Sequence, residues 1–226
     1  LKMLDVLAQR VYNDEGNSTP LYPHNSAPYV HLLSEIGKRV FADRAEYLGD
    51  PDFFDVPVAE LIKDEYIAMR ASGVKRNGIS DTAKMKPGLP ESEDTTHFSI
   101  IDAQGNAVSN TTTINLGFGS GIVVEGAGFL LNNEMDDFSV KPGVPNFFGA
   151  VGGEANAIAP KKRMLSSMTP SIVLDVNNAV KVVTGSPGGT TIISSVYQSI
   201  LRVLEYKMSA QEAVDVPRFH HQLLPK

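Results

Sequence analysis

The sequence predicts a protein of the α+β class, in which helices come first and strands follow. Up to about residue 75, apolar residues recur at the spacing of amphipathic helices. After residue 95 the pattern changes to short strand-like runs separated by glycine turns. The chain has 226 residues, 42% of them apolar and 20% charged, so it can bury an ordinary globular core.

Three helices are expected before the change of pattern. They cover residues 4–11, 30–47 and 58–69. The second stops at Gly49-Asp50-Pro51, and the third ends before Gly73, because glycine and proline interrupt helices. Residues 76–94 lack periodicity and contain Pro and Gly, which predicts an exposed linker.

The second part of the chain predicts paired strands and two further helices. Strands are expected at residues 97–101, 107–114, 171–174 and 179–183. The last two form a hairpin around Asn177-Asn178. One helix follows Gly185-Ser186-Pro187-Gly188-Gly189, and the capping-box spacing of Ser209-Ala210-Gln211-Glu212 predicts another.

Composition excludes several classes of function. The absence of cysteine rules out disulfides, thiolate catalysis and cysteine zinc sites. A net charge of -6 without a Lys/Arg-rich run argues against nucleic-acid or anionic-membrane partners. No apolar run is long enough to span a bilayer, and no signal peptide is recognisable. The chain opens within helical sequence and stops without a cap, so we expect a fragment truncated at both ends.

Thr95 stands where the linker meets the first strand. A β-branched residue suits a strand, and on this segment alone that interpretation is the stronger one. Cleavage of the chain before Thr95 would change its chemistry. The residue would then carry its own nucleophile, the hydroxyl, and its own base, the new α-amine.

Three other segments have the composition of binding sites, each with a simpler structural interpretation. Gly188-Gly189 before a helix suits an oxyanion or anion site, or a tight turn. Residues 132–138 are rich in carboxylates and amides, so they suit a substrate ammonium group, a hard metal ion or a solvated loop. Ser166-Ser167 suits a carboxylate, or local backbone groups. His220-His221 lacks metal-ligand spacing and is interpreted as structural.

These pieces occur together, in one order, over nearly the whole chain. The ordered set closely resembles the γ-glutamyltranspeptidase family, and it is far more specific than any one of its motifs. The matching segments are Ala42-Asp43-Arg44-Ala45-Glu46-Tyr47-Leu48-Gly49-Asp50-Pro51-Asp52-Phe53, Thr95-Thr96-His97, Gly119-Ser120-Gly121, residues 131–138, Pro142-Gly143-Val144-Pro145-Asn146, Leu165-Ser166-Ser167-Met168, Gly185-Ser186-Pro187-Gly188-Gly189 and Pro217-Arg218-Phe219-His220-His221.

The resemblance implies an N-terminal-nucleophile hydrolase, an αββα four-layer sandwich that this chain represents in part. It implies autocatalytic cleavage between Asp94 and Thr95 through an N-to-O acyl shift. Residues 1–94 would then be the C-terminal part of a large subunit, and 95–226 most of a small subunit, held together as a heterodimer. The donor would be glutathione or another γ-glutamyl compound, and the acceptor water, an amino acid or a peptide. No metal or organic cofactor is implied, and bacterial relatives suggest a periplasmic or secreted location.

The resemblance also assigns roles to single residues. Thr95 matches the nucleophile, and Thr113 the threonine that hydrogen-bonds to it. Gly188 and Gly189 match the oxyanion hole. Matches to the donor-binding groups are Asn115, Glu134 and Asp137 for its α-amine, and Ser166 and Ser167 for its α-carboxylate.

Two departures from the family pattern qualify these roles. Residues 142–160 resemble a lid loop, in which Phe148 stands where some relatives have a tyrosine, so a lid hydrogen bond is lost there. The family's large subunit also carries an arginine that pairs with the donor carboxylate, in a part that this chain lacks. Three alternatives remain open: a cephalosporin (glutaryl) acylase, a poly-γ-glutamate processing enzyme, and an inactive unprocessed fragment.

Overall fold

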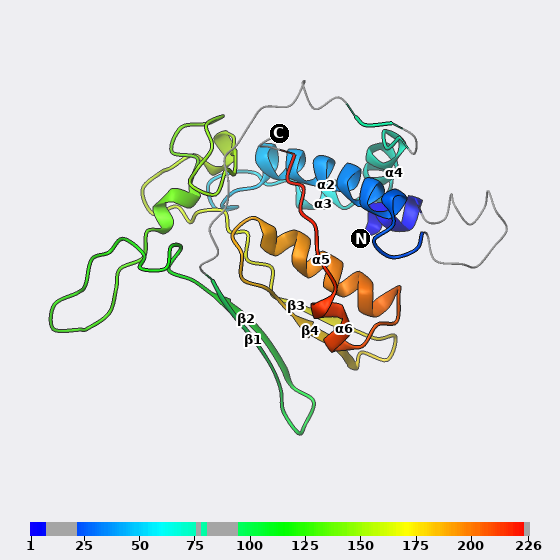
Figure 1. The fold of residues 1–226 in the computed structure, drawn as a ribbon. Coiled ribbons are helices and arrows are strands. Elements are labelled where there is room, and N and C mark those ends of the chain that lie inside the picture. Colours follow the sequence, from blue (N-terminus) through cyan, green and yellow to red (C-terminus); the bar gives the residue numbers. More distant parts are fainter. Residues whose placement is uncertain (8–21, 76–77, 81–94, 224–226) are drawn as a thin grey trace.

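The computed structural model describes residues 1–7, 22–75, 78–80 and 95–223. Three layers are visible in Figure 1: helix α2 (Ala27–Tyr47), then helix α5 (Thr191–Leu204), then two β-hairpins. All strands of the described residues follow Thr95, and α2 to α4 precede it, in agreement with the predicted α+β class. The end of the first predicted helix, Asp94 and most of the linker lie outside the described residues.

The helical part before residue 75 follows the predicted pattern with one correction. Residues 2–7 are helical, and α2 buries Leu32, Leu33 and Ile36 against Leu201 of α5. The third predicted helix is wrong as a single element, because it is split into α3 (Val58–Leu61) and α4 (Asp64–Ser72). Lys63 is extended between them, and the new helix begins with acidic residues, which the helix dipole favours there.

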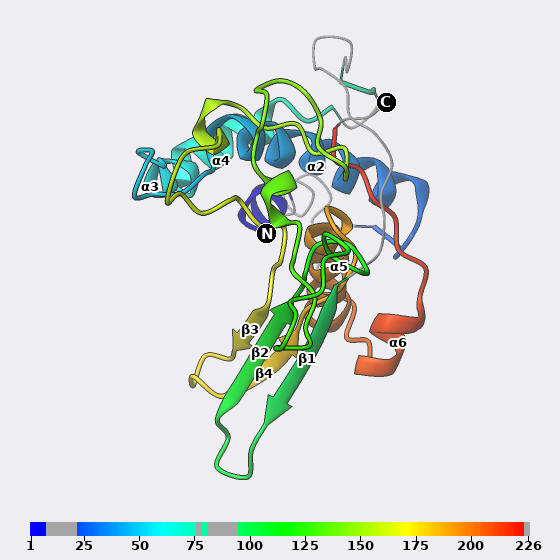
Figure 2. The same cartoon turned by 90° about the vertical axis from the view of Figure 1, so that its left-hand side faces the viewer.

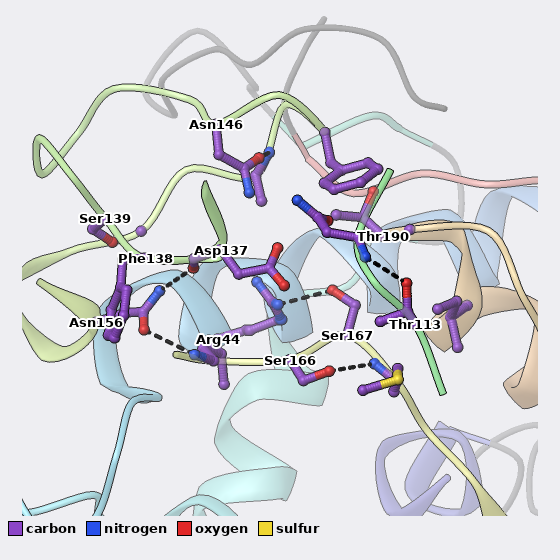
Figure 3. A pocket seen from close by; sticks show the side chains of 18 of the residues that line it. Arg44, Thr113, Asp137, Phe138, Ser139, Asn146, Asn156, Ser166, Ser167 and Thr190 are labelled. Atoms are coloured by element: carbon purple, nitrogen blue, oxygen red, sulfur yellow. Dashed lines mark hydrogen bonds between the residues drawn. The ribbon is translucent and has the colours of Figure 1, made fainter. Parts of the chain in front are cut away.

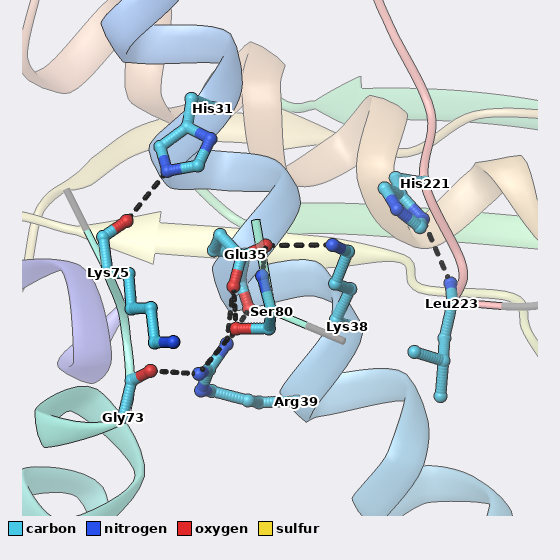
Figure 4. A network of polar contacts seen from close by, with 9 residues as sticks. All are labelled: His31, Glu35, Lys38, Arg39, Gly73, Lys75, Ser80, His221 and Leu223. Atoms are coloured by element: carbon cyan, nitrogen blue, oxygen red, sulfur yellow. Dashed lines mark hydrogen bonds and ion pairs between the residues drawn. The ribbon is translucent and has the colours of Figure 1, made fainter. Parts of the chain in front are cut away.

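A buried polar network ties α2 to Ser80, within the predicted linker (Figure 4). Glu35 is only 1% exposed and pairs with Lys38 at 2.7 Å and Arg39 at 3.0 Å. It also accepts hydrogen bonds from the backbone N–H and the hydroxyl of Ser80. Burial alone would raise the pKa of Glu35, but these hydrogen bonds hold it down at about 2. The charged network therefore fixes Ser80, one of the few described residues of the predicted linker, against α2.

Two antiparallel hairpins lie side by side below α5 (Figure 2). In the first, β1 (Thr96–Ile101) pairs with β2 (Ala107–Thr112); in the second, β3 (Ser171–Leu174) pairs with β4 (Val180–Thr184). The Ser109 hydroxyl donates to the carbonyl of Thr184 at 2.9 Å and so links them. Strand β2 ends two residues earlier than predicted, because Asn115 turns the chain with a φ of +75°.

The C-terminal helices agree with their sequence signals. Helix α5 begins at Thr191 after the glycine turn and buries Ile192, Val196 and Ile200. Helix α6 (Ala210–Asp215) carries both reciprocal hydrogen bonds of the predicted capping box. The Nδ1 of His220, the residue interpreted as structural, lies 2.7 Å from the Ser194 hydroxyl of α5.

Residues 113–170 follow an irregular path along the end of α2. The described chain there contains two short 3₁₀ helices, η2 (Glu134–Asp137) and η3 (Glu154–Asn156). Gly153 donates its N–H to the carbonyl of Ala45 at 2.8 Å, which fixes this segment to α2. No helix in the described ranges has both the length and the apolar character needed to cross a membrane.

Candidate active site

One cavity gathers the predicted site residues from segments far apart in the sequence (Figure 3). Its walls come from the end of α2, the entry to β1, the exit of β2, η2, residues 139–156, the Ser166-Ser167 segment and the turn before α5. Of the predicted residues, it brings together Thr95, Thr113, Asn115, Asp137, Phe148, Ser166, Ser167 and Gly189. Glu134 and Gly188 lie next to the lining, and Asp94 is outside the described residues.

Thr95 and Thr113 face each other where the β1–β2 ladder ends. The ladder pairs Thr96 with Thr112, so each of the two threonines is one residue beyond the last pair. The hydroxyl of Thr95 donates to Oγ1 of Thr113 at 3.4 Å. That oxygen also accepts the backbone N–H of Asn115 at 2.9 Å. The predicted nucleophile and its partner hydroxyl are thus adjacent because of strand register.

Asn115 connects this pair to the acidic segment. It is buried, and its side-chain N–H donates to the carbonyl of Asn133 at 3.1 Å. The Asn133 side chain accepts in return from the N–H of Leu116 at 3.1 Å. These reciprocal bonds hold η2, which begins at the next residue, against the end of β2.

Glu134 and Asp137 are neighbouring carboxyl groups on η2. Burial, followed by the hydrogen bond with Glu134 and its charge, raises the pKa of Asp137 to about 7. Burial also raises the pKa of Glu134. Arg44 opposes the shift at Asp137 by its positive charge. A cationic ligand such as an ammonium group would complete the neutralisation of this pair.

Arg44 was not predicted as a site residue, although it lies within a segment that carries the family resemblance. It extends from the last turn of α2 and donates from Nη2 to the Ser167 hydroxyl at 2.9 Å. Figure 3 shows its guanidinium between Asp137 and Ser167. Burial lowers the pKa of Arg44, and the charge of Asp137 opposes that change. The sequence did not reveal this contact, because Arg44 reads as an ordinary charged residue of a helix and Ser167 lies 123 positions away.

Ser166 and Ser167 present hydroxyls to the same cavity. Ser166 accepts the N–H of Met168 at 3.1 Å, and Ser167 accepts from Arg44. A hydroxyl that accepts one hydrogen bond keeps its own proton to donate, which suits an anionic ligand group. Upstream, Arg163 fixes the segment by pairing with the buried Asp50 at 2.6 Å.

The glycine turn before α5 forms the opposite wall. Gly188 and Gly189 have φ values of +122° and +51°, which non-glycine residues rarely adopt. The carbonyl of Gly188 accepts the N–H of Thr191, so α5 begins directly behind the turn. Gly189 lines the cavity at the positive end of this helix.

Phe148 closes the cavity by apolar contact. Its ring is only 5% exposed and lies against Gly189, where an added Cβ would come within 2.8 Å of the ring. Phe147 packs edge-to-face on it, with ring centroids 5.5 Å apart. The Phe148 ring therefore packs against the glycine turn and forms part of the cavity wall. Within the described ranges, no group of three His, Asp or Glu side chains could hold a metal ion.

The chain is similar to known proteins along its whole length. The family model described as Gamma-glutamyltranspeptidase matches residues 1–226. A glutathione hydrolase proenzyme from Pseudomonas aeruginosa is 60% identical over 202 residues, which is 89% of this chain and 36% of that protein. An acylase ACY 1 proenzyme from Pseudomonas sp. (strain SE83) is 40% identical over 205 residues, or 90% of this chain and 34% of that protein.

Solved structures show the same relationship. The γ-glutamyltranspeptidase from Pseudomonas nitroreducens, complexed with L-DON, superposes with a TM-score of 0.57 at 60% identity. The match covers 58% of this chain and 67% of that one. The present chain spans about a third of the length of its curated relatives, 36% in the Pseudomonas aeruginosa protein. By sequence along its whole length, and by structure over more than half of it, the chain belongs to the γ-glutamyltranspeptidase family.

Proposed function

We propose that the full-length protein is a γ-glutamyltransferase and glutathione hydrolase that activates itself by cleavage between Asp94 and Thr95. The observation that carries this proposal is the single cavity in which the Thr95–Thr113 hydroxyl pair faces Asp137, Ser166 and Ser167. A nucleophile, an ammonium-binding carboxyl and carboxylate-binding hydroxyls are the parts needed for γ-glutamyl transfer.

Self-cleavage makes the catalytic residue. The hydroxyl of Thr95 attacks the carbonyl carbon of residue 94, the peptide C–N bond breaks, and an ester joins that carbonyl to the Thr95 oxygen. Water then hydrolyses the ester, which frees the carboxylate of residue 94 and the threonine hydroxyl. The released α-amine of Thr95 becomes the general base for its own hydroxyl.

Turnover repeats the acyl chemistry on a donor. Thr95 attacks the γ-carbonyl and passes its proton to its α-amine, while Gly188 and Gly189 stabilise the oxyanion. The amine then protonates the leaving amino group, and a γ-glutamyl ester remains on Thr95. Water releases glutamate from this ester, or the amine of an amino acid or peptide takes up the γ-glutamyl group.

Recognition of the donor rests on opposite charges at the two sides of its head group. Asp137, Glu134 and Asn115 would accept hydrogen bonds from the α-ammonium group. Ser166 and Ser167 would donate to the α-carboxylate, with Arg44 adding positive charge behind Ser167. We further propose that the complete enzyme forms the four-layer αββα sandwich from a large and a small subunit, and that it acts in the periplasm or outside the cell.

Mass spectrometry of the full-length protein tests the proposal directly. We expect two chains, the smaller one beginning at Thr95, and hydrolysis of γ-glutamyl anilide. Thr95→Ala should leave one intact, inactive chain, whereas Thr96→Ala, one position along in β1, should still be cut. An uncut wild-type protein that turns over the anilide would show that Thr95 is not the nucleophile.

A glutaryl acylase is the second candidate, since an acylase is among the relatives of this chain. A glutaryl group keeps a terminal carboxylate for Ser166 and Ser167 but lacks the α-amine, so Asp137 would have no ammonium partner on such a substrate. Comparing γ-glutamyl and glutaryl anilides separates the two. We expect preference for the γ-glutamyl compound, and preference for glutaryl would overturn the proposed function.

A further inference from the structure

We infer that Asn156 is a positioning residue that holds the ammonium-binding and carboxylate-binding sides of the cavity at a fixed separation. The inference rests on the proposed function and extends it to a residue that contacts neither the hydroxyl of Thr95 nor the γ-carbonyl of the proposed donor. Asn156 lies at the end of η3, within the segment that resembles a lid loop, and it is only 5% exposed.

The side-chain amide of Asn156 joins the two sides directly (Figure 3). Its Nδ2 donates to the backbone carbonyl of Asp137 at 2.7 Å. Its Oδ1 accepts the backbone N–H of Leu165 at 2.9 Å, one residue before Ser166. One partner is a pure acceptor and the other a pure donor, so the amide has only one satisfactory orientation. The bridge therefore requires both the N–H donor and the carbonyl acceptor of a side-chain amide, and a polar side chain with only one of them would not complete it.

The backbone of Asn156 adds a second attachment on the same side. Its carbonyl accepts the N–H of Ser139 at 2.9 Å, two residues after Asp137. Asn156 thus holds the chain at Asp137 by a side-chain bond and at Ser139 by a main-chain bond. Neither η2 nor the serine segment can shift without breaking one of these contacts.

The bridge itself is held by α2. Gly153 donates to the Ala45 carbonyl at 2.8 Å, and Gly49 lies so close to Ala155 that an added Cβ would be 2.1 Å from its carbonyl oxygen. Arg44 extends from the same turn of α2 to Ser167. The η3 segment that carries Asn156, through Gly153, and Arg44 are thus both attached to the C-terminal end of α2.

The test uses the full-length protein with Asn156→Ala, Asn156→Asp and the matched control Asn177→Ala, an exposed asparagine in the β3–β4 turn. Mass spectrometry first confirms self-cleavage, and kcat and KM are then measured with γ-glutamyl anilide, together with inhibition by free L-glutamate. For Asn156→Ala we expect KM and the inhibition constant to rise together by roughly 10- to 100-fold, with kcat changed much less. Asn177→Ala should match the wild type.

Asn156→Asp keeps the shape of the side chain and the acceptor for Leu165, but it loses the donor to Asp137. Its new carboxylate would lie near Asp137, which already faces Glu134 and Asp136 on η2 and Arg44 from α2. The acidic limb of the pH profile of kcat/KM should therefore move to higher pH. This variant carries the test if Asn156→Ala fails to fold.

Unchanged KM and glutamate inhibition in a cleaved Asn156→Ala enzyme would overturn the inference, as would a wild-type KM and pH profile in Asn156→Asp. A fall in kcat alone, with KM unchanged, would show a general structural role instead. Failure of the wild type to hydrolyse γ-glutamyl anilide would refute the proposed function, which is a separate result.

Discussion

The carboxyl pair on η2 should make binding of the proposed γ-glutamyl donor sensitive to pH near neutrality. Burial, with Glu134 beside it, raises the pKa of Asp137 to about 7, so this carboxyl gains a proton as the pH falls through neutrality. A protonated carboxyl attracts an ammonium group less than a carboxylate does. As pH falls below 7, KM for the γ-glutamyl donor should rise, by up to about tenfold per pH unit.

Glu134→Gln tests this origin of the shift. The substitution removes a neighbouring carboxyl group that raises the pKa of Asp137, so the pKa should fall and the rise in KM should move to lower pH. Steady-state kinetics between pH 5 and 9, about two units on either side of the pKa of Asp137, would show this shift in the KM profile. Glu125→Gln, at an exposed residue, is the control. Identical KM profiles for Glu134→Gln and the wild type would contradict the assignment.

Arg44 should matter through both Ser167 and Asp137. Arg44→Gln removes a charged donor to the Ser167 hydroxyl and the positive charge that lowers the pKa of Asp137. We expect kcat/KM for γ-glutamyl anilide to fall by roughly 10- to 100-fold, since a hydrogen bond to a charged group contributes about 1.5–3 kcal/mol. The acidic limb of the pH profile of kcat/KM should move to higher pH, whereas Glu134→Gln should move it to lower pH. Arg218→Gln, at an exposed arginine, should have little effect; an unshifted limb in Arg44→Gln would refute the coupling.

These residues show what the sequence could and could not predict of the site. Glu134, Asp137, Ser166 and Ser167 were predicted because motifs of recognisable order contain them. The raised pKa of Asp137 was not predicted, because its main cause is burial by other segments of the chain. Arg44 was missed because its contact with Ser167 spans 123 positions. Asn156 was missed because its side chain bonds to two separate segments, at Asp137 and at Leu165.

At the level of elements, the turn between β4 and α5 has little room for a side chain at Gly188. An alanine at Gly188 would have to adopt a φ of +122° and would place its Cβ 2.4 Å from the Thr191 hydroxyl. The turn would have to rearrange, and the backbone N–H groups proposed for the oxyanion hole would move with it. Gly188→Ala should therefore lower kcat by about 10²- to 10³-fold.

Gly121→Ala provides the comparison for that turn. Gly121 also has a positive φ, +73°, but an added Cβ there would meet nothing within 4 Å. Both variants carry backbone strain, whereas only Gly188→Ala alters the turn beside the cavity. Kinetics on processed protein of each should show a kcat near the wild-type value for Gly121→Ala. Equal losses in the two variants would indicate general destabilisation rather than a damaged oxyanion site.

Element boundaries were predicted where local chemistry decides them. Helix α6 begins at its capping box, and α2 ends beside Gly49, because these signals act within one turn of helix. The early end of β2 has no such local signal. Asn115 leaves the strand because its side chain bonds to Asn133, a contact made only in the folded chain.

On the scale of the whole molecule, the parts before and after the proposed cleavage site share one core. Leu32, Leu33 and Ile36 of α2 pack with Leu201 of α5 in a single apolar cluster. Polar contacts cross the same boundary, including Arg44 to Ser167 and Asp50 to Arg163. Cleavage at Thr95 would remove the covalent link and leave all of these contacts in place.

The processed full-length protein should therefore remain one heterodimer. We expect its two chains to elute together in size-exclusion chromatography, at the volume of the uncut Thr95→Ala protein. They should stay together at 1 M salt, where the screening length is only about 3 Å, because burial of apolar surface is little affected by screening. Denaturant should separate them. Dissociation by salt alone would show that the charged pairs, rather than the α2–α5 core, hold the two parts of the chain together.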